Sequence, residues 1–135
     1  MNFYLGTYEH SLLPNYQLAI PKKIRSVIKG STVILSSGFD KCIFGFDTES
    51  FSKISQPGLA KEIFTDEGRT IRRDLFGTAE ELKMDVQGRL SLPANLRTLA
   101  GIEIGAELYI VGAGDHFEIW SKENWERQAA KPEKV

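Results

Sequence analysis

Asp85 and Arg89 are the two residues of this sequence whose types and spacing point most clearly to a binding site. The run from Asp85 to Gly88 has the composition of a tight turn, because Asp accepts hydrogen bonds from the backbone just after it and Gly adopts a positive φ without steric cost. An arginine at the edge of such a turn can fork its guanidinium onto phosphate oxygens or onto the O6 and N7 atoms of guanine. Asp85, Gln87, Gly88 and Arg89 are therefore candidate residues of a DNA-binding site.

The carboxylate of Asp85 has a different predicted role from the guanidinium of Arg89. DNA phosphates repel a carboxylate, so we expect Asp85 to orient Arg89 or to cap the turn. The alternative is that the two residues form only a surface salt bridge, which would shape the turn without any contact to DNA.

A second group of cations precedes this turn in the sequence. Lys22 and Lys23 are candidate phosphate contacts in a short predicted helix that also carries Arg25. A solvated helix face explains the same residues equally well. We expect Arg97, which matches Arg25 in the duplication described below, to make a scaffold contact that both copies need.

Other reactive side chains form no recognisable site. Cys42 is the single cysteine, so it cannot form an internal disulfide, and we expect it to be a small buried residue. His10 and His116 are too far apart in sequence to give a metal-ligand spacing. Neither a Ser/His/Asp grouping nor a phosphate loop is visible. We therefore expect no enzyme activity, no metal and no cofactor.

Two aromatic residues, Phe46 and Trp120, each follow an apolar stretch at the end of a predicted strand. Exposed aromatics at such places could stack on nucleic-acid bases. Large aromatics after apolar residues are more often buried, so we expect both side chains to belong to the core.

The charged turn is followed by elements that would hold it in place. Leu90-Ser91-Leu92 alternates apolar and polar residues, as a short half-buried strand does. Pro93 then fixes a φ that suits the first turn of a helix, and Gly101 ends that helix. The unit is thus a turn, a strand and a helix, with Arg89 at the junction of the turn and the strand.

The same unit occurs earlier in the chain without its charges. Residues 18–25 match residues 90–97 position for position in their order of apolar residues, proline and final arginine, which indicates an internal duplication. The other matched pairs are Gly6-Thr7 with Gly77-Thr78, Glu9 with Glu80, Gly38 with Gly112, Phe46 with Trp120, Glu49 with Glu123, and Phe51 with Trp125. In the first copy the residues at the places of Asp85, Gln87, Gly88 and Arg89 are Leu13, Asn15, Tyr16 and Gln17.

The two copies and the segment between them define three regions. We expect a first half at 1–52 with its core at 7–50, a helical connector at 53–75, and a second half at 76–135 with its core at 79–122. The expected strands are 4–12, 16–20, 32–36 and 41–46, and then 79–84, 89–92, 107–111 and 116–120. Each half also has one helix between its second and third strands, from Pro21 to about Val27 or Ile28 and at 93–100.

The remaining helices follow the fourth strand of each half. Asp47 has the character of an N-cap for a helix that Pro57-Gly58 should end. Helical patterns follow at 59–64 and 67–75, and in the latter Ile71 and Leu75 share a face. Ser121 should cap a last helix, and 129–135 should form a frayed tail.

Composition indicates a globular protein. Of the 135 residues 41% are hydrophobic and 26% charged, and no apolar run approaches the roughly 20 residues of a membrane helix. The first five residues have neither a basic lead nor an apolar core, so we expect no export signal and a cytoplasmic protein. The net charge of −1 excludes a uniformly basic nucleic-acid binder, which leaves a local binding face or one repeated by assembly.

Each half is too small to stand alone. Four short strands and one short helix cannot close a core or cover the edges of a sheet. We therefore expect the two halves to pair and the chain to form a homo-oligomer.

In order and in duplication these motifs resemble the MraZ family. The resemblance rests on the Gly-Thr start, on Asp-x-x-Gly-Arg-Leu-Ser-Leu-Pro at 85–93, on Phe-Glu-Ile-Trp at 117–120, and on Arg-Arg-Asp-Leu-Phe-Gly in the connector. It covers about residues 5–127. The fold that it implies is mostly β with short helices, an α+β class in which two SpoVT/AbrB-like halves form a swapped-hairpin barrel with a pseudo-twofold axis and assemble into a ring.

The function that the resemblance implies is a transcriptional regulator of division and cell-wall genes, located on the nucleoid. It would bind double-stranded DNA at short direct repeats in promoters. The Asp-x-x-x-Arg signature of the family falls on Asp85 and Arg89, whereas the first half has Leu13 and Gln17 at those positions. An oligomeric scaffold with weakened or lost DNA binding is therefore the competing function.

Overall fold

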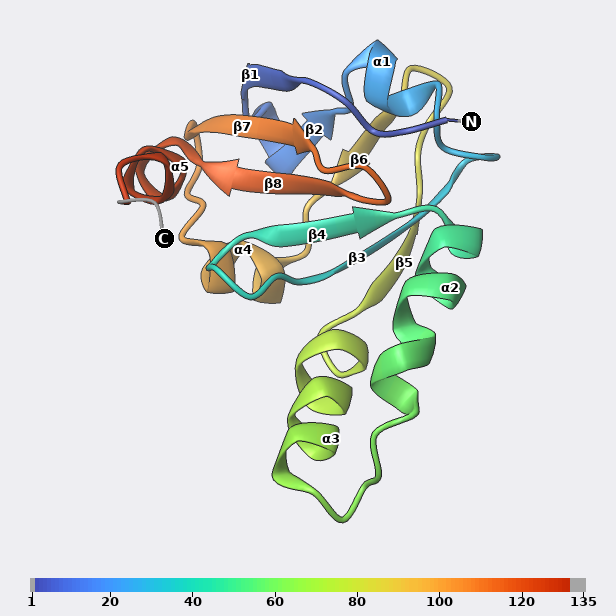
Figure 1. Cartoon of the computed structure of the whole chain (residues 1–135). Helices are drawn as coiled ribbons and strands as arrows, with labels where there is room; N and C mark the ends of the chain where they lie inside the picture. Colours follow the sequence, from blue (N-terminus) through green and yellow to red (C-terminus); the bar gives the residue numbers. More distant parts are fainter. Residues whose placement is uncertain (1, 132–135) are drawn as a thin grey trace.

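Short segments rich in β-branched and aromatic residues pair as strands in the computed structural model, which describes residues 2–131 (Figure 1). The result is a mixed α+β fold, mostly antiparallel sheet with short helices. The elements of the first half and the connector are β1 (Thr7–Ser11), η1 (Pro14–Tyr16), β2 (Gln17–Ala19), α1 (Lys22–Arg25), β3 (Thr32–Ser37), β4 (Ile43–Phe46), α2 (Thr48–Leu59), α3 (Asp66–Ile71) and the π-helical turn η2 (Arg72–Phe76). The elements of the second half are β5 (Glu80–Lys83), β6 (Arg89–Ser91), α4 (Ala94–Ala100), β7 (Glu107–Gly112), β8 (Phe117–Ser121) and α5 (Lys122–Ala129).

The strands form two antiparallel sheets. The larger has the order β1-β7-β8-β4-β3-β5, and β2 pairs only with β6 in a separate two-stranded ribbon. Strands β1 and β5 end the order of the larger sheet. Strand pairing within residues 2–131 therefore does not close the barrel that the family resemblance implied, because the ribbon forms its own sheet instead of joining the edges.

The pairing order has a symmetry that relates the two halves. Exchanging β1 with β5, β3 with β7, and β4 with β8 reverses the order of the larger sheet but leaves every neighbour unchanged. In the ribbon, Leu18 lies opposite Leu90, the residue that it matches in the duplicated sequence. Strand β1 pairs with β7 of the second half and β5 pairs with β3 of the first half, so the halves are interleaved rather than side by side.

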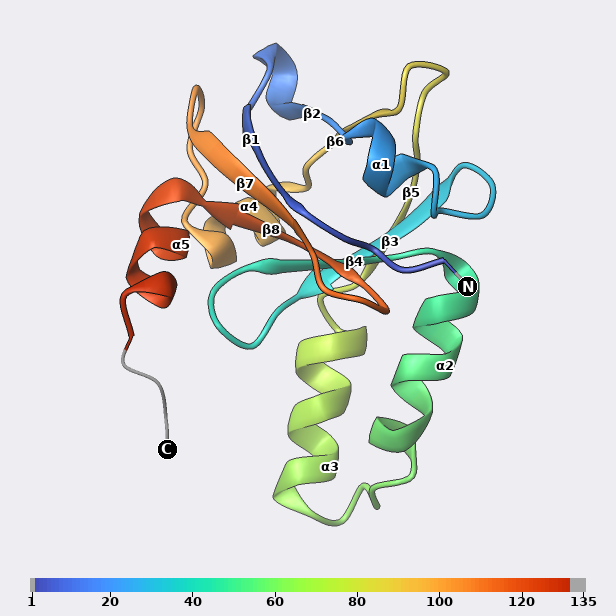
Figure 2. The ribbon, with the colours of Figure 1, turned by 45° about the horizontal axis from the view of Figure 1, so that its top comes forward.

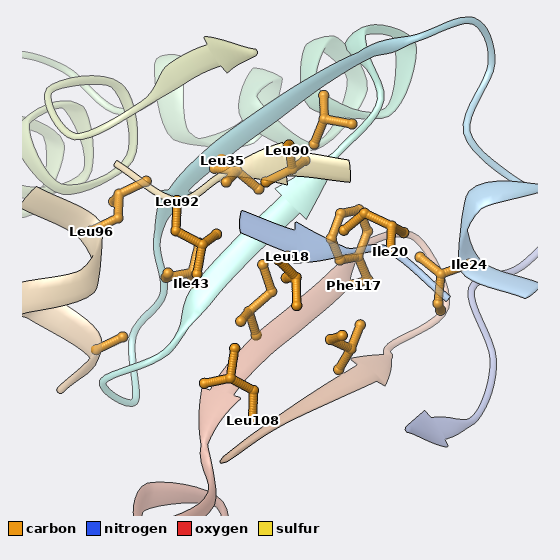
Figure 3. Packing of buried hydrophobic residues seen from close by; sticks show 14 of the residues in the cluster. Leu18, Ile20, Ile24, Leu35, Ile43, Leu90, Leu92, Leu96, Leu108 and Phe117 are labelled. Atoms are coloured by element: carbon orange, nitrogen blue, oxygen red, sulfur yellow. The ribbon is translucent and has the colours of Figure 1, made fainter. Parts of the chain in front are cut away.

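One hydrophobic core is shared by both halves. The ribbon contributes Leu18 and Leu90 to it, and the two helices that follow the ribbon strands contribute Ile24 and Leu96. Figure 3 shows these side chains directed toward residues of the larger sheet such as Phe117. Burial of each such side chain contributes about 1.5–3 kcal/mol, so the core fixes the position of the ribbon over the sheet.

Three predictions about buried residues are confirmed. Phe46 and Trp120 are core residues, with exposed fractions of 1% and 3%, so neither ring can stack on a base. Cys42 is buried. Burial raises the pKa of its thiol, which keeps the thiol protonated and unreactive.

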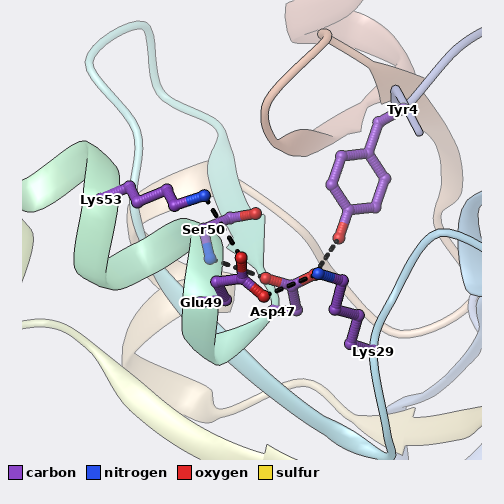
Figure 4. A network of polar contacts seen from close by, with 6 residues as sticks. All are labelled: Tyr4, Lys29, Asp47, Glu49, Ser50 and Lys53. Atoms are coloured by element: carbon purple, nitrogen blue, oxygen red, sulfur yellow. Dashed lines mark hydrogen bonds and ion pairs between the residues drawn. The ribbon is translucent and has the colours of Figure 1, made fainter. Parts of the chain in front are cut away.

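A polar network fixes the start of α2 (Figure 4). Asp47 caps the helix as predicted, because its Oδ1 accepts a hydrogen bond of 2.7 Å from Ser50 N. Its Oδ2 accepts one of 3.4 Å from the hydroxyl of Tyr4. Lys29, between α1 and β3, pairs with Glu49 at 2.8 Å and so ties the helix to the first half.

The connector differs from the prediction in two respects. Helix α2 continues through Pro57 and Gly58 to Leu59, because a proline in the last turn removes only one hydrogen bond and Ala60 N still donates to Gln56 O. Gly58 is needed there, since a Cβ would overlap Ile71 of α3. The predicted helix at 59–64 is wrong, because α2 ends at Leu59 and residues 60–65 form the loop before α3, which Thr65 caps.

Helices α2 and α3 project together from one end of the molecule in both orientations (Figures 1 and 2). Leu75 of η2 is buried against the sheets, as the predicted apolar face requires.

Ser121 caps α5, the last helix, through a hydrogen bond of 3.1 Å from Asn124 N. The predicted frayed tail begins inside α5, and its residues 132–135 lie outside the described residues. Within residues 2–131 no helix is both long and apolar enough to cross a membrane.

Candidate nucleic-acid interface

The turn between β5 and β6 is built around the carboxylate of Asp85. Its Oδ1 accepts hydrogen bonds of 2.9 Å from the backbone N–H groups of Gln87 and Arg89. The backbone closes the same loop, since Asp85 N donates to Arg89 O at 2.9 Å and Gly88 N donates to Asp85 O at 3.0 Å. Gly88 has a φ of +75°, which explains why a glycine follows Gln87.

The second oxygen of Asp85 holds the arginine. Arg89 Nε donates to Asp85 Oδ2 at 2.9 Å, so one carboxylate both caps the turn and orients the guanidinium. These contacts lower the pKa of Asp85 below its ordinary value, chiefly through the hydrogen bond from the Arg89 backbone N–H. Asp85 therefore stays ionised, and the orientation of Arg89 persists, at neutral pH.

The ribbon presents Arg89 on its outer face. Side chains alternate along a strand, so Leu18 and Leu90 point into the core while their neighbours point out. The outer residues, which we call the ribbon face, are Gln17, Ala19, Arg89 and Ser91. The side chain of Arg89 keeps 39% of its surface exposed, and within residues 2–131 its two Nη atoms donate no hydrogen bond to the protein. These atoms are thus free to fork onto an anion or onto guanine.

The other predicted residues of the turn lie beside Arg89. Val86 at the tip is fully exposed, and the side chain of Gln87 is exposed next to it. Gly88 is buried and has no side chain, so its role is to shape the turn and not to contact a ligand. The structure therefore brings Asp85, Gln87 and Arg89 together at one exposed surface.

Helix α1 lies against this turn. Arg25 Nη1 donates a hydrogen bond of 2.6 Å to Gln87 O, which connects α1 of the first half to the turn of the second. Lys22 and Lys23 are both exposed on this short helix. The two lysines thus belong to an element that touches the charged turn, although their own ammonium groups make no hydrogen bond within residues 2–131.

The turn before β2 shares a backbone hydrogen bond with the charged turn but differs from it in chemistry and at Asn15, which has a positive φ where its counterpart Gln87 does not. Leu13 N donates to Gln17 O at 2.8 Å, as Asp85 N does to Arg89 O. Asn15 and Tyr16 both have a positive φ, and Tyr16 stands where the second copy has Gly88. Because β2 and β6 are antiparallel, the two turns lie at opposite ends of the ribbon, and both stand at the edge of the molecule that is uppermost in Figure 2. The first turn therefore offers a similar scaffold but neither carboxylate nor guanidinium.

Arg97 makes the scaffold contact that its matched position predicted. Its guanidinium carbon lies 3.4 Å from the centroid of the Tyr16 ring, and its Nε donates to Leu92 O at 3.0 Å. Each helix arginine thus reaches the turn of the other half. The sequence did not reveal that Arg25 contacts Gln87, although the matched arginines gave the signal that could have found it.

Comparisons with known proteins point to one family. A family model described as "MraZ protein, putative antitoxin-like" matches residues 75–134, the half that contains the charged turn. A protein named Transcriptional regulator MraZ from Roseiflexus sp. (strain RS-1) is 36% identical over 123 residues, which are 91% of this chain and 84% of the relative. Proteins of the same name from Mesoplasma florum and Thermomicrobium roseum are 37% and 35% identical, over 91% and 93% of this chain and 83% and 87% of their own lengths.

Proposed function

Since the chain belongs to the MraZ family, whose members are transcriptional regulators and not enzymes, we propose that it binds promoter DNA in a sequence-specific manner through the charged turn and the ribbon face. The observation that carries this proposal is the hydrogen-bonded ion pair between Asp85 and Arg89. One carboxylate fixes the turn and the guanidinium together, which leaves two Nη atoms exposed in a defined direction. Such an arrangement suits bidentate recognition of guanine.

Other residues add contacts to the sugar-phosphate backbone in this proposal. Lys22 and Lys23 on α1 neutralise phosphates beside the turn, and Gln87 offers an amide to DNA. Asp85 and Gly88 act by shaping the turn. The binding surface is local, which reconciles DNA binding with a net charge of −1.

Assembly supplies the affinity that one turn lacks. A single arginine contact contributes roughly 1–3 kcal/mol of base discrimination, far less than a specific site requires. Several copies in a ring would engage successive direct repeats, where each later contact becomes intramolecular. Light scattering tests the assembly, because a single species of 15.2 kDa, the mass of one chain, would contradict it.

The proposed architecture is a duplicated SpoVT/AbrB-like fold. The halves 1–52 and 76–135, joined by the connector 53–75, would be related by a pseudo-twofold axis. The unchanged strand neighbours on exchange of the halves and the pairing of Leu18 with Leu90 support this. The proposed targets are division and cell-wall genes, and the proposed location is the nucleoid in the cytoplasm.

A ring-forming scaffold without useful DNA affinity is the second candidate. The absence of charge at Leu13 and Gln17, where the other half has Asp85 and Arg89, favours it. Only half of the expected arginine contacts to DNA would then remain, and the binding free energy that they contribute together would be too small for a useful affinity.

A gel shift with the DNA upstream of its own gene distinguishes the two functions. A DNA-binding regulator should prefer this fragment over a shuffled one, and its affinity should fall steeply with salt because phosphate contacts release counterions. Replacement of Lys22 and Lys23 by Ala should weaken binding to both fragments alike and flatten the salt dependence. A scaffold should show no shift at any salt concentration.

A further inference from the structure

Arg25 crosses from the first half of the chain to the turn that carries Arg89. We propose that Arg25 is a positioning residue for DNA recognition, which holds the charged turn in its binding conformation without being a base contact itself. This inference rests on the proposed function of that turn. It assigns a role to α1 beyond the phosphate contacts of its lysines.

Two consecutive carbonyl groups of the turn are held by the first half. Arg25 Nη1 donates to Gln87 O at 2.6 Å, and Ile20 N donates to Gly88 O at 3.0 Å. Asp85 binds the same segment from the other side through the N–H groups of Gln87 and Arg89. The backbone immediately before Arg89 is therefore fixed on both sides, once by its own half and once by the other half.

The packing between Arg25 and Gly88 is close. A Cβ on Gly88 would overlap the side chain of Arg25, so the guanidinium occupies the space that a glycine leaves open. Gly88 is buried by this arrangement. The absence of a side chain at position 88 thus serves two ends, a positive φ and access of Arg25 to the Gln87 carbonyl.

The matched arginine of the other half makes a different contact. Tyr16 stands where Gly88 would be, and the guanidinium of Arg97 stacks on its ring at 3.4 Å. Arg97 donates to Leu92 O of its own half, and within residues 2–131 it donates no hydrogen bond to a carbonyl of the first turn. Arg97 therefore supports a turn without charges, and it provides a matched control for Arg25.

This division explains a feature of the duplication. The first copy lacks the charged turn, yet its helix still carries the arginine at position 25. In the structure Arg25 donates its hydrogen bond to the turn of the second copy and not to the turn of the first copy, in which it lies. The DNA-binding turn of one half thus depends on the helix of the other.

The test compares Arg25→Lys with Arg97→Lys in the full chain. Lysine keeps the positive charge but lacks the planar fork that lies along Gly88 and reaches Gln87 O. Affinities for the DNA upstream of its own gene and for a shuffled fragment of equal length are measured by fluorescence anisotropy, and thermal midpoints are measured beside them. If Arg25→Lys does not fold, Arg25→Gln is compared with Arg97→Gln by the same readouts, so that both variants lose one positive charge and only a larger loss on the upstream fragment for Arg25→Gln supports the proposal.

We expect Arg25→Lys to lower the affinity for the upstream fragment about tenfold. A loss of this size lies within the range of interaction energies found between residues in contact. Affinity for the shuffled fragment and the salt dependence should stay unchanged, because the charge is kept. Arg97→Lys should leave both affinities within about twofold of the parent, whatever its effect on the thermal midpoint. In an Arg89→Ala background Arg25→Lys should have no further effect.

Two results would overturn the role of Arg25. Equal losses on both fragments would make Arg25 a phosphate contact, and unchanged affinity for the upstream fragment would make its contact structural only. The proposed function fails separately, because it requires Arg89→Ala to lose the preference for the upstream fragment. If Arg89→Ala loses it and Arg25→Lys keeps it, only the present inference is wrong.

Discussion

At the scale of single residues, Asp85 divides its carboxylate between two tasks. Oδ1 receives backbone N–H groups and Oδ2 receives the guanidinium of Arg89. The sequence predicted one task or the other, and because all three contacts lie within four positions a single carboxylate performs both. It did not predict the contact of Arg25 with Gln87, which joins residues far apart in the sequence through tertiary packing.

Asp85→Asn separates the two tasks. The amide oxygen of Asn can still accept from the Gln87 and Arg89 backbone, whereas its NH₂ group cannot accept from Arg89 Nε. We expect the thermal midpoint to stay near that of the parent while specific DNA affinity falls about fivefold, a fraction of what a bidentate arginine contributes. Anisotropy titration and thermal melting measure the two effects. A parental DNA affinity would mean that Arg89 needs no orientation by Asp85.

Gly88→Ala tests the close packing of the turn, with Gly105→Ala as its control. Both glycines have a φ near +75°, so each alanine costs roughly 1–2 kcal/mol of backbone strain. Only at Gly88 would the new Cβ overlap Arg25, which would have to move and give up its hydrogen bond to Gln87 O, a further loss of about 0.5–1.5 kcal/mol. Urea denaturation should therefore show the larger loss of unfolding free energy for Gly88→Ala. Equal losses would show that the space beside Gly88 is not restricted.

At the scale of elements, most strands and helices could be predicted within a few residues, because apolar alternation and capping residues mark them locally. The exceptions lie in the connector. Pro57 and Gly58 read locally as the end of a helix, but packing of Gly58 against Ile71 lets α2 continue for another residue. The division of the strands into a six-stranded sheet and a separate ribbon depends on pairing between strands far apart in the sequence, and no local sequence pattern predicts such pairing.

Strands β4 and β8 meet at a titratable cluster that predicts a pH dependence of stability. His116 bridges Asp115 and Glu118 at 2.7 and 2.8 Å, and its ring centroid lies 4.6 Å from that of Phe44 in β4. Burial lowers the pKa of His116, but the hydrogen bonds with Glu118 and Asp115 outweigh burial and hold that pKa above its ordinary value of 6.5. The folded state therefore favours the protonated ring.

A raised pKa stabilises the fold while the ring is protonated in both states, and this stabilisation is lost as the pH rises through the folded-state value. The free energy of unfolding should thus be largest below pH 6.5 and should fall as the pH rises beyond it. Urea denaturation across this range measures the fall. In the His116→Gln variant the free energy of unfolding should fall less than in the parent over the same pH range. A parent stability that rises over the same range would contradict the assignment.

At the scale of the whole molecule, the two halves share one core and exchange their supporting contacts. The duplicated sequence predicted that the halves would pair, and the strand order shows them interleaved. The loss of charge in the first turn could also be read from the sequence. What could not be read is that Gln17 lies on the same ribbon face as Arg89, since this depends on the register in which Gln17 opposes Ser91.

Restoring the first turn should strengthen binding because of this register. Gln17 is diagonal to Arg89 across the ribbon, a separation of about 7–8 Å in such pairs. Leu13→Asp together with Gln17→Arg would place a second oriented guanidinium beside the first, and specific affinity should rise at least about fivefold. The single variant Leu13→Asp is the control and should bring no gain. If the double variant binds no better than the parent, DNA does not reach the first turn.

The central claim is that Arg89 reads DNA sequence from the charged turn, and one titration tests it most directly. Arg89→Ala and the parent are titrated by anisotropy against the DNA upstream of its own gene and against a shuffled fragment. Because Arg89 is exposed on the ribbon face, the variant should keep the oligomeric state of the parent in light scattering. We predict that it loses the preference for the upstream fragment while it retains the weak affinity for shuffled DNA. An Arg89→Ala protein that still prefers the upstream fragment as strongly as the parent would contradict the claim.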